Sequence, residues 1–189
     1  MSLPESQSIT DAEPLLRTEP QSMAATRSLL RKVTQVVWLI VLAFTSYLVV
    51  SHFFVQSVRV VGRSMAPTLE DSRFYLLNRW VLYVRAPQRT DIVVIRDPQD
   101  NGFSVKRVIA AEGDSVVIKD GTVFVNGQKL EESYLPPHTP TFSTPPLNEQ
   151  SFKCDKDQYF VLGDNRNCSL DSRTYGPIAR SKILGLIIH

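Results

Sequence analysis

The sequence predicts a mainly β protein: an antiparallel β-sheet or partial barrel behind a single N-terminal transmembrane helix. Three observations predict it. A long uncharged apolar stretch lies near the N-terminus, short β-branched runs follow it, and helical periodicity is absent after residue 56 apart from one possible turn within 75–83. The 189 residues suffice for one ordinary domain and an appendage. A hydrophobic content of 43% argues against a disordered chain, and a net charge of +2 is too small to indicate nucleic-acid binding.

The apolar stretch covers residues 33–55 and contains no Asp, Glu, Lys or Arg. As a helix it would span about 35 Å, against about 30 Å of bilayer hydrocarbon. A buried core helix would rarely be apolar on every side for so long. A cleaved secretory signal would have a shorter apolar region and a small-residue exit, whereas the exit here reads "SHFFVQS". We therefore expect an uncleaved transmembrane helix, with the lipid bilayer as a partner.

Residues 1–32 are expected to form a mobile cytoplasmic tail, because the segment is rich in Pro, Ser, Thr, Gln and acidic residues. Its acidic residues argue against a transit peptide. Basic residues favour a cytoplasmic N-terminus and an extracytoplasmic (periplasmic or thylakoid-lumen) domain, since those before the span outnumber those after it: Arg27, Arg31 and Lys32 against Arg59 and Arg63.

Residues 56–189 are expected to form the β-rich extracytoplasmic domain. A hairpin is predicted over residues 114–127, since Asp120-Gly121 is a pair that a type I′ turn prefers. Five prolines between residues 131 and 156 predict a long loop, and with the hairpin this loop forms an insertion at about 112–157. The other predicted strands are 57–61, 74–78, 91–96, 103–110, 158–164 and 182–188.

Ser64 lies in "VVGRSMAPTLEDS" and is a candidate nucleophile that needs a base. The three histidines do not suggest a fixed imidazole, because His52 lies at the membrane edge, His138 in the Pro-rich loop and His189 at the C-terminus. The chain has no G-x-S-x-G motif. Its His and Cys residues show no ligand spacing, so no metal site is predicted.

Lys106 is the candidate base. Strand alternation places Ser104 and Lys106 on one face and Arg107 on the other, so one of the two basic neighbours faces inward or protects a sheet edge. In one interpretation Lys106 is a solvated lysine on a half-exposed strand. In the other it is a buried lysine whose pKa is lowered by desolvation, and only a neutral amine can accept the serine proton.

Four segments, in chain order, resemble the sequence boxes of type I signal peptidases, also called leader peptidases: "GRSMAPTLEDS", "DIVVIRDP", "VKRVIAAEGD" and "VLGDNRNCSLDSRTYGPI". They span residues 60–178. The resemblance implies a membrane-bound serine endopeptidase that uses a Ser/Lys dyad and no cofactor. Its partners would be preproteins, from which it removes signal peptides by cleaving after small residues.

The resemblance also implies roles for individual residues. Gly62 stands where some family members have a serine that helps to bind the oxyanion, so here the Ser64 N–H is one donor and the second is unassigned. Ser64 would be the nucleophile, Lys106 the general base and Ser169 the hydroxyl that orients the amine. Asp171 and Arg173 would form a supporting ion pair, while Asp164 and Asn165 would shape the loop.

Substrate binding is assigned to apolar residues near the dyad. By resemblance, such side chains line shallow pockets for small residues one and three positions before the cut, although each could equally belong to the core. From Val55 to Ser64 the extended chain spans at most about 32 Å, which keeps the nucleophile near the bilayer. The assigned residues are Val58, Val60, Met65 and Val105.

Two other functions stay open at this point. One is an anchored β-domain that binds a partner without catalysis. The other is a Ser/Lys protease with a different substrate, as in self-cleaving repressors, although the apolar span counts against it. Cys154 and Cys168 could form one bridge in an oxidising compartment or remain free thiols.

Overall fold

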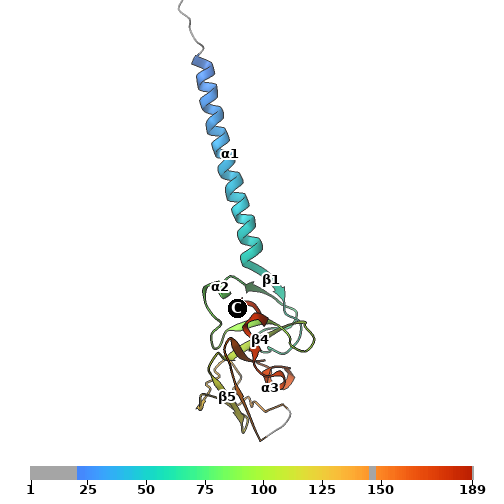
Figure 1. Cartoon of the computed structure of the whole chain (residues 1–189). Coiled ribbons are helices and arrows are strands. Elements are labelled where there is room, and N and C mark those ends of the chain that lie inside the picture. Colours follow the sequence, from blue (N-terminus) through green and yellow to red (C-terminus); the bar gives the residue numbers. More distant parts are fainter. Residues whose placement is uncertain (1–20, 145–147, 189) are drawn as a thin grey trace, which may run out of the picture. The chain divides into compact units, whose positions relative to one another are not determined.

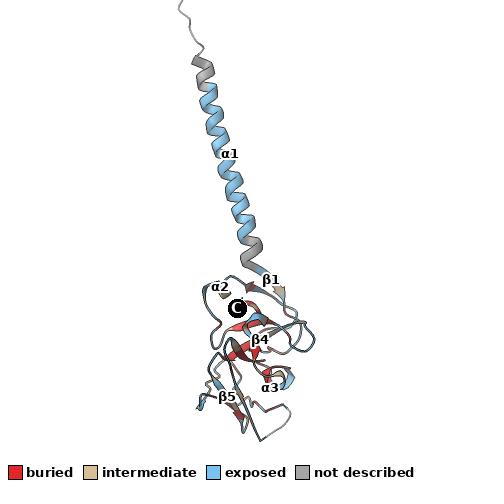
Figure 2. Cartoon of the chain, viewed as in Figure 1, coloured by how far each residue is buried: buried red, intermediate tan, exposed pale blue. Residues whose placement is uncertain are grey.

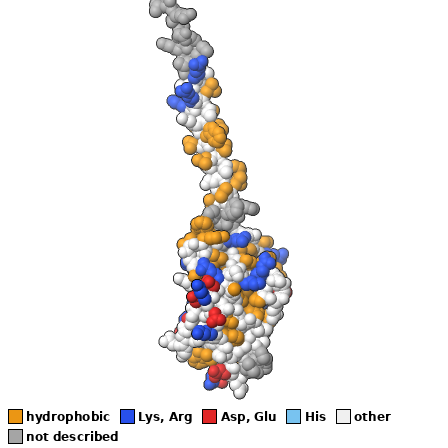
Figure 3. Space-filling view, in the orientation of Figure 1, with side chains coloured by type: hydrophobic (Ala, Val, Ile, Leu, Met, Phe, Trp, Pro, Cys, Tyr) orange, Lys and Arg blue, Asp and Glu red, His pale blue; other side chains and the backbone are white. Residues whose placement is uncertain are grey.

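The N-terminal helix α1 runs from Gln21 to Phe54 in a computed structural model that describes residues 21–144 and 148–188. The chain forms two compact units, Met1–Ser46 and Tyr47–His189. Helix α1 is a single long ribbon (Figure 1), and its described residues are exposed (Figure 2). Thr26–Val50 is long and apolar enough to cross a membrane. Basic side chains lie near the N-terminal end of the helix, and hydrophobic ones follow along it (Figure 3).

The helix begins earlier than the sequence analysis expects. Residues 21–32, assigned there to a mobile tail, are helical, and the rest of that tail lies outside the described residues. The physical reason is composition: 21–32 contains Met, Ala, Leu, Arg, Lys and Gln, and has no Pro or Gly. At the other end, Val55 already belongs to a strand.

A seven-stranded antiparallel sheet forms the main part of the second unit, so the mainly β prediction is confirmed. Strand β11 lies between β2 and β3, and it is antiparallel to both. In spatial order the strands are β1 (Val55–Arg59), β2 (Phe74–Asn78), β11 (Ile183–Ile188), β3 (Ile92–Arg96), β4 (Phe103–Ala110), β9 (Gln158–Leu162) and β10 (Ile178–Ala179).

A second, four-stranded sheet contains the expected hairpin. Asp120 and Gly121 have φ values of 50° and 73°, the left-handed backbone that a type I′ turn requires. Strand β8 forms within the segment expected to be a loop and pairs with β5 along its full length. In spatial order the strands are β7 (Gln128–Lys129), β6 (Thr122–Val125), β5 (Ser115–Lys119) and β8 (Glu149–Lys153).

Short helices fill the connections of the second unit. Helix α2 lies within the segment where the sequence suggests a possible turn. The others follow β9 or precede β11 in the chain. The helical segments are α2 (Val81–Val84), α3 (Ser172–Tyr175), and the 3₁₀ turns Arg166–Cys168 and Arg180–Lys182.

The core that positions Ser64 consists of apolar side chains on both sides of it. Val60, Met65 and Leu69 are buried and pack against side chains of the seven-stranded sheet, including Leu77 and Val94. Each fully buried side chain of this size contributes about 1.5–3 kcal/mol. This packing fixes the segment that carries the serine on the sheet, while Ser64 itself stays half-buried.

Candidate active site

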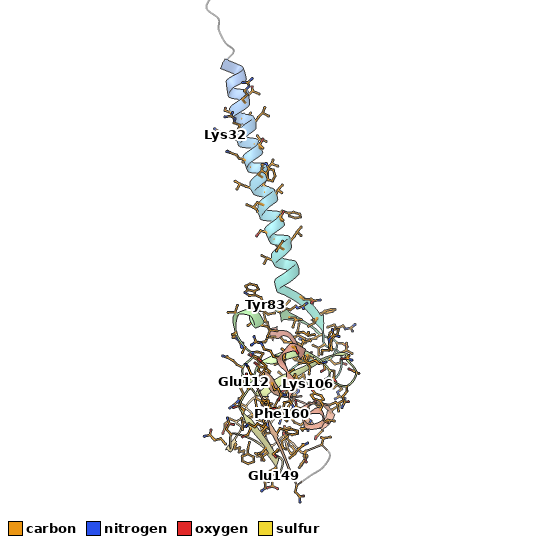
Figure 4. The ribbon with its side chains drawn as sticks, in the orientation of Figure 1. Lys32, Tyr83, Lys106, Glu112, Glu149 and Phe160 are labelled. Carbon is orange, nitrogen blue, oxygen red and sulfur yellow. The ribbon has the colours of Figure 1, made fainter. Side chains whose placement is uncertain are left out.

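Ser64 and Lys106 meet in the second unit although they are distant in the sequence. Lys106 lies in the middle of β4, inside the β-domain (Figure 4), and its Nζ is 3.4 Å from Ser64 Oγ. That separation is at the long end of a hydrogen bond. The structure therefore brings together the serine and the lysine that the sequence analysis singled out.

The environment of Lys106 favours a neutral amine. The residue is only 3% exposed, and burial lowers the pKa of its amine below the ordinary value of 10.5. The negative charges of Asp171 and Asp97 oppose this shift, and the positive charge of Arg173 adds to it. Within residues 21–144 and 148–188, no carboxylate forms a salt bridge with Lys106, so burial is the stronger influence.

Asp171 and Arg173 form the ion pair that the resemblance implies. Arg173 donates to both carboxylate oxygens of Asp171, with Nε–Oδ1 at 2.8 Å and Nη2–Oδ2 at 2.9 Å. Both residues are buried. Asp171 Oδ2 also accepts a hydrogen bond from the Gly163 N–H at 3.0 Å. Asp171 is the carboxylate that raises the pKa of Lys106 most. Because Arg173 neutralises it, this increase is limited.

Gly163 is a site residue that the sequence analysis missed. A Cβ built on Gly163 would lie 2.6 Å from the Ser64 carbonyl oxygen and would overlap the side chain of Ser169. The Ser64 carbonyl accepts a hydrogen bond from the N–H of Asn165 at 2.9 Å. Only glycine allows the loop after β9 to approach Ser64 this closely. The sequence signal for it is slight: a single glycine where a predicted strand reaches an acidic loop.

Ser169 does not make the hydrogen bond to the lysine amine that the resemblance implies. Its Oγ is buried and has no hydrogen-bond partner among the described residues. The hydroxyl instead lies against Gly163. It is a buried donor without a partner beside the dyad.

Arg107, the neighbour of Lys106 on the opposite face of β4, is also buried, at 4% exposure. Its guanidinium donates to Asp164 twice, at 2.9 and 2.6 Å, and to the Thr90 carbonyl at 2.9 Å. It also lies 4.0 Å from the centroid of the Tyr134 ring. Lys106 and Arg107 are therefore both buried, although strand alternation alone predicts a buried side chain for only one of them.

A groove of about 560 Å³ opens beside Ser64. Its lining includes Val58, Val60 and Val105, three of the four residues assigned to substrate binding, and these also contact the core. Met65 does not line it, since it is 1% exposed within the core. Residues of β1 and β4 line the same groove although three strands separate them, so the seven-stranded sheet is curled.

Gly62 lies at the edge of this site with φ of +108°, a conformation that favours glycine. Its N–H donates to Asp71 Oδ1 at 2.8 Å, and open space surrounds the position of a Cβ. A serine here would be strained by the backbone rather than by its neighbours. The two cysteines are free thiols: Cys154 is buried and Cys168 is exposed.

Comparison with known proteins shows the family of this chain. The model of the signal peptidase family, peptidase S26, matches residues 33–188. Signal peptidase I of Bacillus amyloliquefaciens is 34% identical over 177 residues, covering 89% of this chain and 91% of the relative. A probable signal peptidase I-2 of Synechocystis is 37% identical over 141 residues, covering 70% of this chain and 61% of the relative.

A solved signal peptidase I from Enterococcus faecalis matches with a TM-score of 0.45 and 28% identity, covering 55% of this chain and 98% of that structure. The family match and the relatives define the class of protein, a peptidase. This chain belongs to the signal peptidase family, peptidase S26, and has the function of a membrane signal peptidase.

Proposed function

We propose that Ser64 and Lys106 form the catalytic dyad of this signal peptidase. The observation that carries the proposal is a buried lysine, without a salt-bridged carboxylate among the described residues, 3.4 Å from Ser64 Oγ. In the first step the neutral amine takes the hydroxyl proton while Ser64 Oγ attacks the scissile carbonyl carbon. The carbonyl π electrons move to its oxygen, and the Ser64 N–H stabilises that oxyanion.

The next steps return the dyad to its starting state. The Lys106 ammonium gives its proton to the leaving amine as the C–N bond breaks, which leaves an ester on Ser64. The neutral amine then takes a proton from water as the water oxygen attacks the ester. When the ester bond breaks, the ammonium returns a proton to Ser64 Oγ. Asp171 and Arg173 hold the loop beside the amine, and their mutual pairing keeps the net charge there close to zero.

The groove beside Ser64 supports a preference for small residues before the cut. Val58 and Val60 contribute apolar surface from one side, and Val105 contributes it from β4, next to the base. An extended substrate bound beside β4 would place alternate side chains against this surface. We propose that preproteins with small residues one and three positions before the scissile bond are the substrates.

The same proposal includes an orientation. Arg27, Arg31 and Lys32 precede the apolar part of α1, and the positive-inside rule places them in the cytoplasm. The β-domain would then lie on the extracytoplasmic side, anchored to the lipid bilayer by α1. Cysteine accessibility separates the two orientations: in intact cells, an impermeant thiol reagent should modify the exposed Cys168. Modification only after lysis would reverse the orientation.

The catalytic proposal is tested by cleavage of a preprotein with the purified full-length chain in detergent. We expect Ser64→Ala and Lys106→Met to lower the cleavage rate by about 10⁴-fold or more while both variants remain folded. Cleavage that persists in folded Lys106→Met would overturn the dyad. A non-catalytic binding function predicts no cleavage by any form of the chain, including wild type.

A further inference from the structure

The groove beside Ser64 is lined by positively charged side chains as well as by apolar ones. Three arginines, Arg59, Arg79 and Arg96, are among its lining residues, and no aspartate or glutamate is. Leu77, Val94 and Leu184 also belong to the lining, on strands of the seven-stranded sheet. The groove is therefore an apolar trough with a cationic rim. The inference below rests on the proposed function, in which this groove binds the substrate.

Two of the arginines lie at the same edge of the sheet. Arg96 is the last residue of β3 and Arg79 directly follows β2. Both strands are antiparallel to β11, which lies between them, so their carboxyl ends meet at one edge with Leu184 of β11 nearby. Arg96 pairs with Phe103, which precedes Lys106 by three positions, or about 10 Å along β4.

The charges of these arginines are not neutralised by fixed partners. None of the ion pairs in residues 21–144 and 148–188 includes Arg59, Arg79 or Arg96. Arg59 Nε donates to the Ser72 carbonyl at 3.3 Å, and the Arg96 guanidinium lies 5.6 Å from the centroid of the Phe103 ring. All three residues are exposed, and Figure 3 shows basic side chains beside hydrophobic ones on the domain surface.

We propose that this cationic rim selects substrates by charge. A peptide whose bound segment carries a carboxylate a few residues before the scissile bond is favoured, and one with Lys or Arg there is rejected. The apolar floor keeps water and ions away on one side, which strengthens the interaction relative to a fully solvated pair. Because the arginines line the groove that contains Ser64, a peptide fits them better than a lipid headgroup does.

The test compares sets of three peptides that keep small residues one and three positions before the cut. Within a set, the peptides carry Asp, Asn or Lys at the fourth, the fifth or the sixth position before the cut. With the wild-type chain in neutral detergent, we expect kcat/KM for Asp to exceed that for Lys by about tenfold at the most sensitive position. The double variant Arg79→Gln/Arg96→Gln should reduce this ratio to about twofold. High salt should also reduce it in the wild-type protein.

The matched control is Arg73→Gln. This arginine is exposed, pairs with Glu70 and does not line the groove, so the change removes one positive charge elsewhere in the domain. Its Asp-to-Lys ratio should equal that of the wild-type chain. The single variant Arg96→Gln, which also removes one positive charge, is measured beside it. If the Asp-to-Lys ratio of kcat/KM falls equally in Arg73→Gln and Arg96→Gln, the effect comes from net charge and the proposed role of the groove is wrong.

A binding measurement separates this inference from the catalytic proposal. Fluorescence anisotropy with Ser64→Ala should show the same order, Asp above Asn above Lys, without any cleavage. Equal affinities would overturn charge selection even if the wild-type enzyme cleaves all three peptides. If the double variant changes only its affinity for vesicles of anionic lipid and keeps the peptide ratio, the rim is a lipid contact and the proposal is wrong.

Discussion

The two faces of β4 bury two neighbouring basic residues in opposite ways. On one face Lys106 is 3% exposed, has a hydroxyl within 3.4 Å and makes no salt bridge among the described residues. On the other face Arg107 is 4% exposed and donates to both oxygens of Asp164. Burial without a paired carboxylate lowers the lysine pKa, so the amine can act as a base. Burial with a bidentate partner keeps the arginine charged and makes it structural.

The strongest way to break this comparison is to replace Lys106 with a basic residue that cannot lose its proton. Lys106→Arg should lower kcat/KM for preprotein cleavage by about 10⁴-fold, because a guanidinium stays protonated and cannot accept the Ser64 proton. Arg107→Lys is the matched exchange on the other face and should retain most activity. Substantial activity in Lys106→Arg would show that the residue acts through its charge.

The next effect is on stability. Arg107→Met leaves the Asp164 carboxylate buried without its cation, and should lower the free energy of unfolding by about 3–5 kcal/mol in urea titrations of the full chain in detergent. Arg107→Met/Asp164→Leu removes both charges and should recover most of the loss. If the double variant is as unstable as the single one, packing rather than charge is the function of this pair.

A smaller loss is expected at the loop where the two faces meet. Gly163→Ala places a methyl group against the Ser64 carbonyl and the Ser169 side chain, so the nucleophile must move. We expect kcat to fall by about 10²-fold, since displacement by about 1 Å can cost this much. Gly113→Ala is the control: its Cβ meets open space, and its φ of +84° gives it a backbone strain that Gly163 does not have. Equal losses of activity in the two variants would show that the loss does not come from the contacts of the added methyl group with Ser64 and Ser169.

The smallest effect concerns pH. The folded-state pKa of Lys106 is lowered by burial, while the unfolded chain keeps a value near 10.5. Between these two values the unfolded state binds more protons, so this group makes stability rise with pH; below the lowered pKa its full cost remains. Lys106→Met should therefore exceed wild type in unfolding free energy at neutral pH, by a margin that narrows toward pH 10.5. A margin independent of pH would mean that the lysine is not desolvated.

The cleavage rate should also depend on the protonation state of Lys106. Cleavage by the wild-type chain should rise as Lys106 loses its proton, and should be well developed below pH 9. A profile that rises only above pH 10 would indicate an ordinary solvated lysine.

The sequence predicts one part of this comparison well. The strand that carries Lys106 is evident from its β-branched alternation, and the order of the motifs pairs it with Ser64. The partner of Arg107 was not predictable, since a contact between residues 107 and 164 depends on the pairing of β4 with β9. Strand β8 was missed because "EQSFK" lies beside prolines and has a single large apolar side chain, so backbone pairing with β5 rather than side-chain pattern defines it.

The residues of the candidate site were also predictable only in part. Ser64 and Lys106 were singled out from the residues themselves, and the Asp171–Arg173 pair was implied by the resemblance to the family. Gly163 and the unpartnered Ser169 hydroxyl were not predicted, because close approach and missing hydrogen bonds are properties of three-dimensional packing. The exposure of Met65 was also misjudged: an apolar residue beside a nucleophile fits a pocket and a core equally well, and here it lies in the core.

The hydrogen bonds of Arg166 affect how the β-domain unfolds. Its guanidinium bonds to Glu132 and Thr141 in the segment between β7 and β8, and to the Gly163 carbonyl beside the serine. A buried side chain thereby links the segment between β7 and β8 to the loop after β9. Amide hydrogens of the two regions should exchange with solvent together, as one cooperative unit. Heat or denaturant would then unfold the loop beside Ser64 and the segment between β7 and β8 in one transition.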